Sequence, residues 1–123
     1  MRMFLLLMSF CLLAPHAAYA QAPGDWVLGK WKGGPYWFPG VVEKRAGDKI
    51  TIVFDDGTRD TLPRKLVRKY DWRAGSKVEC RWSGGSEWYA AKIQNIEKDG
   101  STLNVLYEDG VREKTSTGAC RSS

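Results

Sequence analysis

The sequence predicts an all-β protein in which two small five-stranded barrels follow one another along the chain. Two observations carry this prediction. At an offset of 51 residues the chain repeats itself, so that Trp31 matches Trp82 and Trp37 matches Trp88. Within each repeat, β-branched or aromatic residues alternate with polar ones, as over residues 49–54, and a period of two is typical of half-buried strands. The repeat therefore predicts tandem units, and the alternation predicts that each unit is built of strands.

The first twenty residues predict an export signal. Arg2 gives a positive start, residues 3–13 are apolar apart from Ser9, and Ala18-Tyr19-Ala20 is a small-x-small cleavage sequence before Gln21. The apolar run is shorter than the roughly 18 residues that a membrane helix requires. We therefore expect cleavage of residues 1–20, a mature chain without a transmembrane segment, and a periplasmic or secreted location.

Composition argues against most catalytic chemistry. The chain has one histidine, His16, and it falls in the expected signal peptide, which leaves no imidazole for a proton shuttle or a zinc site. The carboxylates of Asp55, Asp56 and Asp109 lie on predicted turns of two different units, a poor arrangement for paired acid and base groups. We therefore expect no enzyme activity, no metal and no cofactor.

The cysteines predict one disulfide. Of three cysteines, Cys11 lies in the expected signal peptide, so Cys80 and Cys120 remain. Two cysteines in an exported chain favour a structural bridge, which would stabilise the fold by about 4 kcal/mol through loop closure. The alternative, a reactive or metal-binding thiol pair, lacks both a nearby histidine and a C-x-x-C spacing.

Domain boundaries follow from the repeat. Past the middle of each unit the offset grows to 53, so that Phe54 matches Tyr107, and the second unit should have a hairpin two residues longer. The units then span residues 24–70 and 75–122, with residues 71–74 as a linker. Because domains below roughly 60 residues are only marginally stable, we expect the two barrels to pack together.

Turn residues place the strands within each unit. Glycine pairs follow the first strand, and Asp-Gly dipeptides, which favour hairpin turns, follow the third; these are Gly33-Gly34, Gly84-Gly85, Asp56-Gly57 and Asp109-Gly110. Pro63 and the basic pair after it predict one helical turn before a fifth strand at residues 66–69, with residues 119–121 equivalent. Cys80 then falls in strand one of the second unit and Cys120 in strand five, which we expect to be neighbours.

Strand two of each unit carries consecutive aromatic residues. Trp37 and Trp88 share one face, because side chains alternate along a strand. We assign this face to the core, since Tyr36 is replaced by Glu87 on the opposite face, a change that a buried position would not permit. Phe38 and Tyr89 then lie at a partly open rim.

The sequence resembles the Tudor family. The resemblance rests on Trp31, Tyr36-Trp37-Phe38 and Phe54-Asp55-Asp56-Gly57, and again on Trp82, Trp88-Tyr89 and Tyr107-Glu108-Asp109-Gly110. The resemblance covers nearly all of the chain after residue 20. The duplication of the unit is similar to that in tandem Tudor proteins. It implies SH3-like barrels that bind methylated lysine or arginine in an aromatic cage. The matching cage positions are Trp31, Phe38, Phe54 and Asp56, and Trp82, Tyr89, Tyr107 and Asp109.

Two features depart from the family pattern. Many cages have a further aromatic residue after the Asp-Gly turn, where this chain has Thr58 and Val111, so one wall should be open. Characterised members mostly read chromatin or RNA-processing proteins inside the cell, whereas this chain carries an expected export signal. The same aromatic residues could also serve only as rim packing between the barrels.

The expected function is non-catalytic binding of a cationic or methylated side chain on a protein or peptide partner. The second pocket is the stronger candidate, because its tyrosine hydroxyls can add hydrogen bonds. An alternative is a basic face that binds nucleic acid or an anionic cell-envelope polymer, with Tyr70 and Trp72 exposed for stacking; its cations are Arg59, Arg64, Lys65, Arg68, Lys69 and Arg73. These cations could equally form a solvated surface, and a structural docking role in the envelope is also open.

Overall fold

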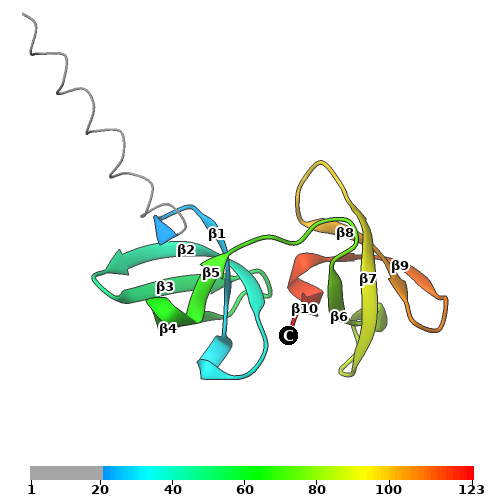
Figure 1. Cartoon of the computed structure of the whole chain (residues 1–123), viewed down its shortest axis with the longest axis horizontal. Helices are drawn as coiled ribbons and strands as arrows, with labels where there is room; N and C mark the ends of the chain where they lie inside the picture. Colours follow the sequence, from blue (N-terminus) through cyan, green and yellow to red (C-terminus); the bar gives the residue numbers. More distant parts are fainter. Residues whose placement is uncertain (1–20) are drawn as a thin grey trace, which may run out of the picture.

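Residues 21–123 are described by a computed structural model, and they form two five-stranded antiparallel sheets, one after the other along the chain (Figure 1). The first contains β1 (Trp26–Gly29), β2 (Phe38–Ala46), β3 (Lys49–Phe54), β4 (Arg59–Pro63) and β5 (Val67–Lys69), in the order β4-β3-β2-β1-β5. The second contains β6 (Lys77–Arg81), β7 (Trp88–Ile96), β8 (Thr102–Tyr107), β9 (Arg112–Ser116) and β10 (Cys120–Arg121), in the order β10-β6-β7-β8-β9. We call them the first and second barrel. The predicted tandem all-β fold is confirmed, while the expected signal peptide lies outside the described residues.

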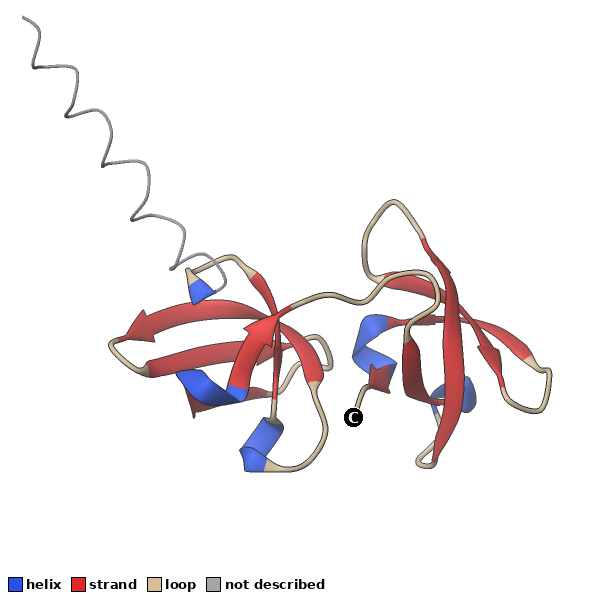
Figure 2. Cartoon of the chain, in the orientation of Figure 1, coloured by secondary structure: helices blue, strands red, loops and turns tan. Residues whose placement is uncertain are grey.

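The two barrels repeat each other in detail. Each has one helical turn between its first two strands, η2 (Trp31–Gly33) or η4 (Trp82–Gly84), and one before its last strand, η3 (Arg64–Leu66) or η5 (Thr117–Ala119) (Figure 2). The second strand of each carries a β-bulge, between Val42 and Lys44 in β2 and between Ile93 and Asn95 in β7. The longer hairpin of the second barrel is residues 97–101, against 47–48 in the first.

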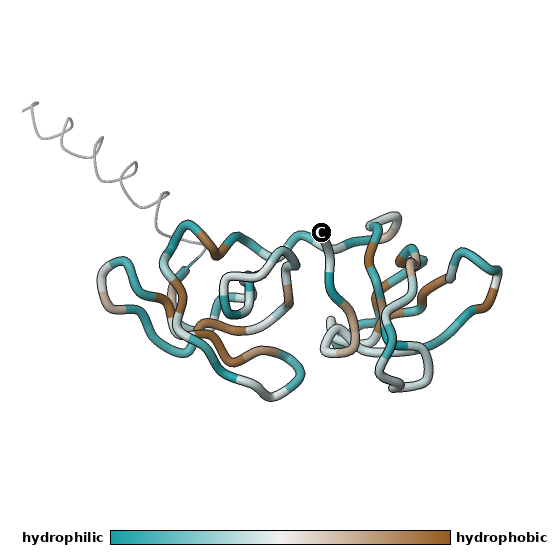
Figure 3. The backbone as a smooth tube through the Cα atoms, turned by 90° about the horizontal axis from the view of Figure 1, so that it is seen from below, coloured by the Kyte–Doolittle hydropathy of each residue, from teal (hydrophilic) through white to brown (hydrophobic). Residues whose placement is uncertain are grey.

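Each barrel has its own hydrophobic core, and hydrophobic and hydrophilic stretches alternate along the chain in both barrels (Figure 3). The strand β1 contributes to both cores because its side chains alternate. Val27 packs with β2, β3 and β4 inside the first barrel, whereas Leu28, on the opposite face, packs into the cluster of the second barrel. The first strand of the chain therefore joins the two barrels.

The last residues of the chain cross back to the first barrel, and the C-terminus lies between the barrels (Figure 1). Trp37 and Ser122 exchange two backbone hydrogen bonds of 2.7 and 3.0 Å. The Thr117 hydroxyl donates to Asp55 Oδ2 at 2.6 Å, and a Cβ on Gly118 would lie 2.7 Å from the Asp55 carbonyl oxygen. Glycine is required at this position because the two backbones approach so closely.

Arg121 adds a second link between the barrels. Its guanidinium lies 3.5 Å from the ring centre of Tyr36 and 4.1 Å from that of Trp88, and its Nη2 forms a 2.8 Å ion pair with Glu79. On another side of the interface, Gly100 in the long hairpin has no room for a Cβ, which would lie 2.5 Å from the ring of Trp26. The expectation that the barrels pack together is confirmed by these contacts.

Packing between the barrels overturns two expectations. Trp37 and Trp88 are half-buried and lie outside the barrel cores: Trp37 packs against the second barrel's cluster, and Trp88 contacts Phe38 with ring centres 6.0 Å apart. Trp72 is buried and Tyr70 is half-buried, so the prediction that both are exposed is wrong. In both cases the reason is the partner barrel, which covers surfaces that one repeat alone would leave open.

The predicted disulfide joins Cys80 in β6 to Cys120 in β10. The two residues are directly paired across these neighbouring strands, and both are fully buried. The bond holds the two-residue strand β10, and with it the residues that contact the first barrel.

Candidate functional site: an aromatic pocket on the second barrel

A pocket of about 410 Å³ lies at one end of the second barrel. Its lining comes from η4, the start of β7, the end of β8 and the turn before β9: Trp82, Tyr89, Ala90, Tyr107, Glu108, Asp109 and Val111. All four residues of the predicted second cage are therefore together around one cavity. They meet because the glycine turn after β6 and the Asp-Gly turn after β8 lie at the same end of the barrel.

The three rings have different roles in this pocket. Tyr107 is only 4% exposed and lies in the core cluster, so its ring belongs to the base. Trp82 and Tyr89 are 54% and 48% exposed, and an exposed ring face is what a bound cation would contact. The pocket thus combines a fixed base with two open aromatic walls.

Glu113 connects the base to one wall. The Tyr107 hydroxyl donates to Glu113 Oε1 at 2.6 Å, and Glu113 Oε2 accepts the backbone N–H of Ser83 at 2.7 Å. Ser83 has a left-handed backbone (φ 56°) directly after Trp82. Burial, together with the Glu113 carboxylate, raises the pKa of Tyr107 well above its usual range. The protonated hydroxyl therefore donates to Glu113, and Glu113 holds the turn that carries Trp82.

Carboxylates border the pocket. Asp109 and Glu108 both line it, and Asp109 Oδ1 accepts the backbone N–H of Val111 at 3.0 Å, which fixes the turn. The Tyr89 hydroxyl donates to Glu87 at 3.2 Å, and this hydrogen bond raises the pKa of Tyr89. The rim is therefore acidic although the chain as a whole has a net charge of +5.

Sequence reasoning missed several residues of this pocket. Val111 was expected to leave one wall open, yet it lines the cavity, and Glu108 and Ala90 line it as well. Glu113 was not considered, although its counterpart Asp60 occupies the matching place in the repeat and accepts the Lys32 N–H at 2.9 Å. Comparing hydrogen-bonding residue types between the two repeats could have identified it.

The first cage is assembled, but only Trp31 among its rings is exposed, at 38%, while Phe54 is buried in the core of the first barrel. The ring centres of Trp31 and Phe38 are 6.3 Å apart, and those of Phe38 and Phe54 are 6.5 Å apart. Phe38 is also packed against Trp88 of the second barrel, and the Nζ of the chain's own Lys32 lies 5.1 Å from the Trp31 ring centre. Asp56 accepts hydrogen bonds from the N–H and hydroxyl of Thr58. Of these three rings, Phe38 therefore packs between the barrels.

The six cations of the alternative basic face lie on β4, η3, β5 and the linker. Arg59 is paired with Glu43 at 2.9 Å, and the guanidinium of Arg68 lies 4.4 Å from the Trp37 ring centre. Arg73 donates to the Asp71 carbonyl at 3.4 Å; Arg64, Lys65 and Lys69 are exposed. The aromatic side chains expected to accompany this face, Tyr70 and Trp72, are turned into the interface.

Within residues 21–123, no group of histidine, cysteine or acidic side chains is arranged to hold a metal ion. No helix in the same part of the chain has the length and apolar character needed to cross a bilayer.

Solved structures similar to this chain include two tandem Agenet domains. No protein-family model matches the chain, and no curated protein sequence matches it significantly. The crystal structure of the ADCP1 tandem Agenet domain 3-4 is 13% identical over 85% of this chain and 81% of its own, with a TM-score of 0.39. The Arabidopsis thaliana AGDP1 AGD34 structure is 13% identical over 85% of this chain and 83% of its own, with a TM-score of 0.42.

Proposed function

We propose that the chain is a non-catalytic binding module whose second barrel accepts a cationic side chain, such as methylated lysine or arginine, on a protein or peptide partner. The observation that carries the proposal is the pocket of about 410 Å³ in which the rings of Trp82, Tyr89 and Tyr107 meet the carboxylates of Glu108 and Asp109. A methylated ammonium group is large, weakly hydrated and positively charged, and therefore suits aromatic faces backed by negative charge.

The two predicted cages differ in how accessible their aromatic rings are to a ligand. The second pocket has an open volume and two exposed rings. In the first, Phe38 is packed against Trp88, and Asp55 accepts a hydrogen bond from Thr117 of the other barrel. We therefore assign the binding activity to the second barrel and a joining role to the first cage.

The expected affinity is low. A cation over an aromatic face contributes about 0.5–2 kcal/mol, so the whole pocket would bind a single side chain in the high micromolar to millimolar range. Useful affinity then requires further contacts from the partner on either side of the modified residue. A peptide or protein is for this reason a better candidate than a free amino acid.

A titration followed by NMR tests the proposal. Trimethyllysine, dimethylarginine and choline should shift the indole signal of Trp82 and the signals of Tyr89 and Asp109, whereas unmethylated lysine should do so less. Trp82→Ala should abolish these shifts, and Trp31→Ala, at the matching position of the first barrel, should leave them unchanged. Equal effects of both variants, or shifts that unmethylated lysine reproduces, would contradict the assignment.

The alternative of anion binding makes a different prediction. Binding of an anionic polymer to the exposed cations at Arg64, Lys65 and Lys69 would weaken steeply as salt is raised, whereas cation binding in the pocket would respond mildly. Burial of Trp72 and pairing of Arg59 with Glu43 remove two features that favoured this alternative. Shifts confined to residues 64–72 at low salt would restore it.

We also propose that the protein acts outside the cytoplasm. The support is the signal-like sequence of residues 1–20, together with the paired cysteines at positions 80 and 120, since disulfides persist in oxidising compartments. Intact mass of the native protein should correspond to a chain beginning at Gln21. A chain that still carries residues 1–20 and is recovered from the cytosol would rule this out.

A further inference from the structure

A second groove, separate from the aromatic pocket, runs over the outer face of the second barrel. Its volume is about 340 Å³, near the lower end of the ~300–1,000 Å³ typical of small-molecule sites. Its lining comes from three adjacent strands: Gln94 and Asn95 on β7, Asn104 and Val105 on β8, and Arg112, Glu113 and Lys114 on β9. Three of these side chains are amides and two are cations. No part of the proposed function uses these five side chains.

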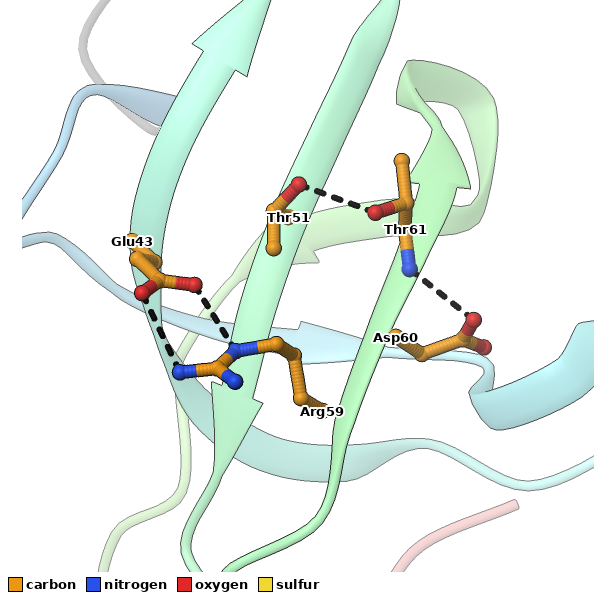
Figure 4. A network of polar contacts seen from close by, with 5 residues as sticks. All are labelled: Glu43, Thr51, Arg59, Asp60 and Thr61. Carbon is orange, nitrogen blue, oxygen red and sulfur yellow. Dashed lines mark hydrogen bonds and ion pairs between the residues drawn. The ribbon is translucent and has the colours of Figure 1, made fainter.

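The matching face of the first barrel shows what these positions do when they satisfy one another. There Arg59 on β4 donates from Nε and Nη2 to the two carboxylate oxygens of Glu43, at 2.9 and 3.2 Å (Figure 4). On the neighbouring strands β3 and β4, the hydroxyls of Thr51 and Thr61 are hydrogen-bonded to each other at 2.9 Å (Figure 4). On this face the arginine therefore has an acidic partner within the chain.

The second barrel keeps the arginine but lacks the carboxylate. Arg112 corresponds to Arg59 at the offset of 53, and Gln94, at the bulge of β7, corresponds to Glu43 at the bulge of β2. An amide at position 94 cannot form the charge-assisted pair. Among residues 21–123, Arg112 has no ion pair and no side-chain hydrogen bond.

The nearby acids are already engaged. Glu97 pairs with Lys114 at 3.1 Å and accepts from the Asn104 amide at 3.0 Å. Glu113 also lines the groove, but both of its carboxylate oxygens already accept hydrogen bonds, from the Tyr107 hydroxyl and the Ser83 N–H. The guanidinium of Arg112 is thus the positive group of the groove that still lacks a partner of opposite charge.

We propose that this groove binds a hydroxyl-rich carboxylate of the sugar-acid type, whose carboxylate takes on Arg112 the place that Glu43 takes on Arg59. A guanidinium presents a planar fork that matches a carboxylate with two parallel hydrogen bonds. The amides of Gln94, Asn95 and Asn104 each offer a donor and an acceptor, which suits hydroxyl groups because these also donate and accept. The sugar ring would lie across β7 and β8 beside the arginine.

Other ligand classes fit the groove less well. None of its lining residues is aromatic, so nucleobases would find no ring to stack on, and stacking is a main contribution to single-stranded nucleic-acid binding. An apolar ligand would leave the amides of Gln94 and Asn95 and the guanidinium of Arg112 without partners, which costs free energy in a closed contact. A compound with one acid group and several hydroxyls satisfies the polar groups present.

The test is an NMR titration of the ¹⁵N-labelled protein at constant ionic strength with sodium galacturonate, galactose and sodium acetate. Galacturonate should produce saturable shifts in the side-chain amide signals of Gln94, Asn95 and Asn104 and in the Nε–H signal of Arg112. Galactose lacks the carboxylate and acetate lacks the hydroxyls, so each should bind roughly tenfold more weakly.

Two variants and a matched control complete the test. Arg112→Gln should weaken galacturonate binding roughly tenfold. Gln94→Glu should abolish binding, because the new carboxylate would pair with Arg112 as Glu43 pairs with Arg59 in the first barrel. Arg59→Gln, the matched substitution in the first barrel, should leave binding unchanged. The proposal is overturned by an absence of saturable shifts at roughly 50 mM galacturonate, by equal binding of acetate, or by full binding to Arg112→Gln. None of these outcomes bears on the aromatic pocket, whose reporter is the Trp82 indole.

Discussion

Two buried tyrosine hydroxyls illustrate how single residues shape this molecule. Tyr107 donates to Glu113 at 2.6 Å, whereas the Tyr70 hydroxyl is buried between the barrels and has no hydrogen-bond partner among residues 21–123. Burial, with smaller contributions from Asp55 and Asp71, raises the pKa of Tyr70 to about 12. The first hydroxyl positions the wall of the pocket, while the second is an unsatisfied polar group that costs stability.

Tyr70→Phe should therefore stabilise the protein. Removing a buried hydroxyl without a partner relieves a desolvation penalty of about 1 kcal/mol, while the ring keeps its contacts with Trp26 and Trp72. Thermal unfolding at pH 7 measures the difference, with Tyr89→Phe, at an exposed hydroxyl, as the control. A lower midpoint for Tyr70→Phe would show that the hydroxyl has a partner.

The same residue predicts a dependence on alkaline pH. Because the pKa of Tyr70 is raised to about 12 in the folded state from about 10 in the unfolded chain, the unfolded chain loses this proton first. The free energy of unfolding is therefore unaffected by this group below pH 10, and it falls as pH rises from 10 to 12, because the unfolded chain ionises more readily. Between these values the wild type should lose stability faster than Tyr70→Phe, as followed by denaturant unfolding. Parallel curves for the two proteins would contradict this.

At the scale of the elements, the shortest strand depends most on covalent support. β10 has two residues and pairs only with β6, yet it precedes Ser122, which pairs with Trp37, and contains Arg121, which stacks on Tyr36. Two backbone pairs alone would hold such a strand weakly, so the Cys80–Cys120 bond stabilises both the second barrel and the interface.

Reduction of this disulfide should lower stability by about 4 kcal/mol, with the largest loss of amide protection in β6 and β10. Hydrogen exchange with and without reductant measures it, and a Cys80→Ala, Cys120→Ala double variant separates loss of the bond from side effects of the reductant. Equal thermal midpoints for oxidised and reduced protein would show that β10 is held by its non-covalent contacts.

The sequence was sufficient for elements whose signals are local. Alternation and Asp-Gly turns predicted the strands, and the cage residues could be placed because they flank these turns. The face assignment of Trp37 and Trp88 failed because alternation groups side chains by face without saying what covers each face. Trp72 and Tyr70 were misjudged for the same reason. Glu113 was missed because its importance depends on a hydrogen bond to a residue 30 positions away.

At the scale of the whole molecule, the barrels are connected through shared apolar residues. Leu28 belongs to β1 of the first barrel, but its side chain is fully buried in the cluster of the second, beside Trp72 and Val78. Its neighbour Val27 is equally buried in the first core. Adjacent residues of one strand therefore report on two different cores.

Leu28→Ala should destabilise the second barrel by about 2–5 kcal/mol, although the residue lies in the first. Val27→Ala is the matched control and should act mainly on the first barrel. Residue-resolved hydrogen exchange distinguishes the two, because loss of protection should be greatest in β6–β8 for Leu28→Ala and in β2–β4 for Val27→Ala. The same pattern of loss in both variants would mean that the barrels unfold as one unit.

The return of the chain to Trp37 has a consequence for the order of synthesis. The five strands of the first barrel are complete at Lys69, whereas the residues that cover Tyr36 and Trp37 are Arg121 and Ser122. At roughly 5–20 residues per second, a ribosome would need several seconds to make the intervening segment. During that time the nascent first barrel presents Leu28 and Trp37 to its surroundings, and this is the interval in which a chaperone or export factor would find an apolar surface to hold.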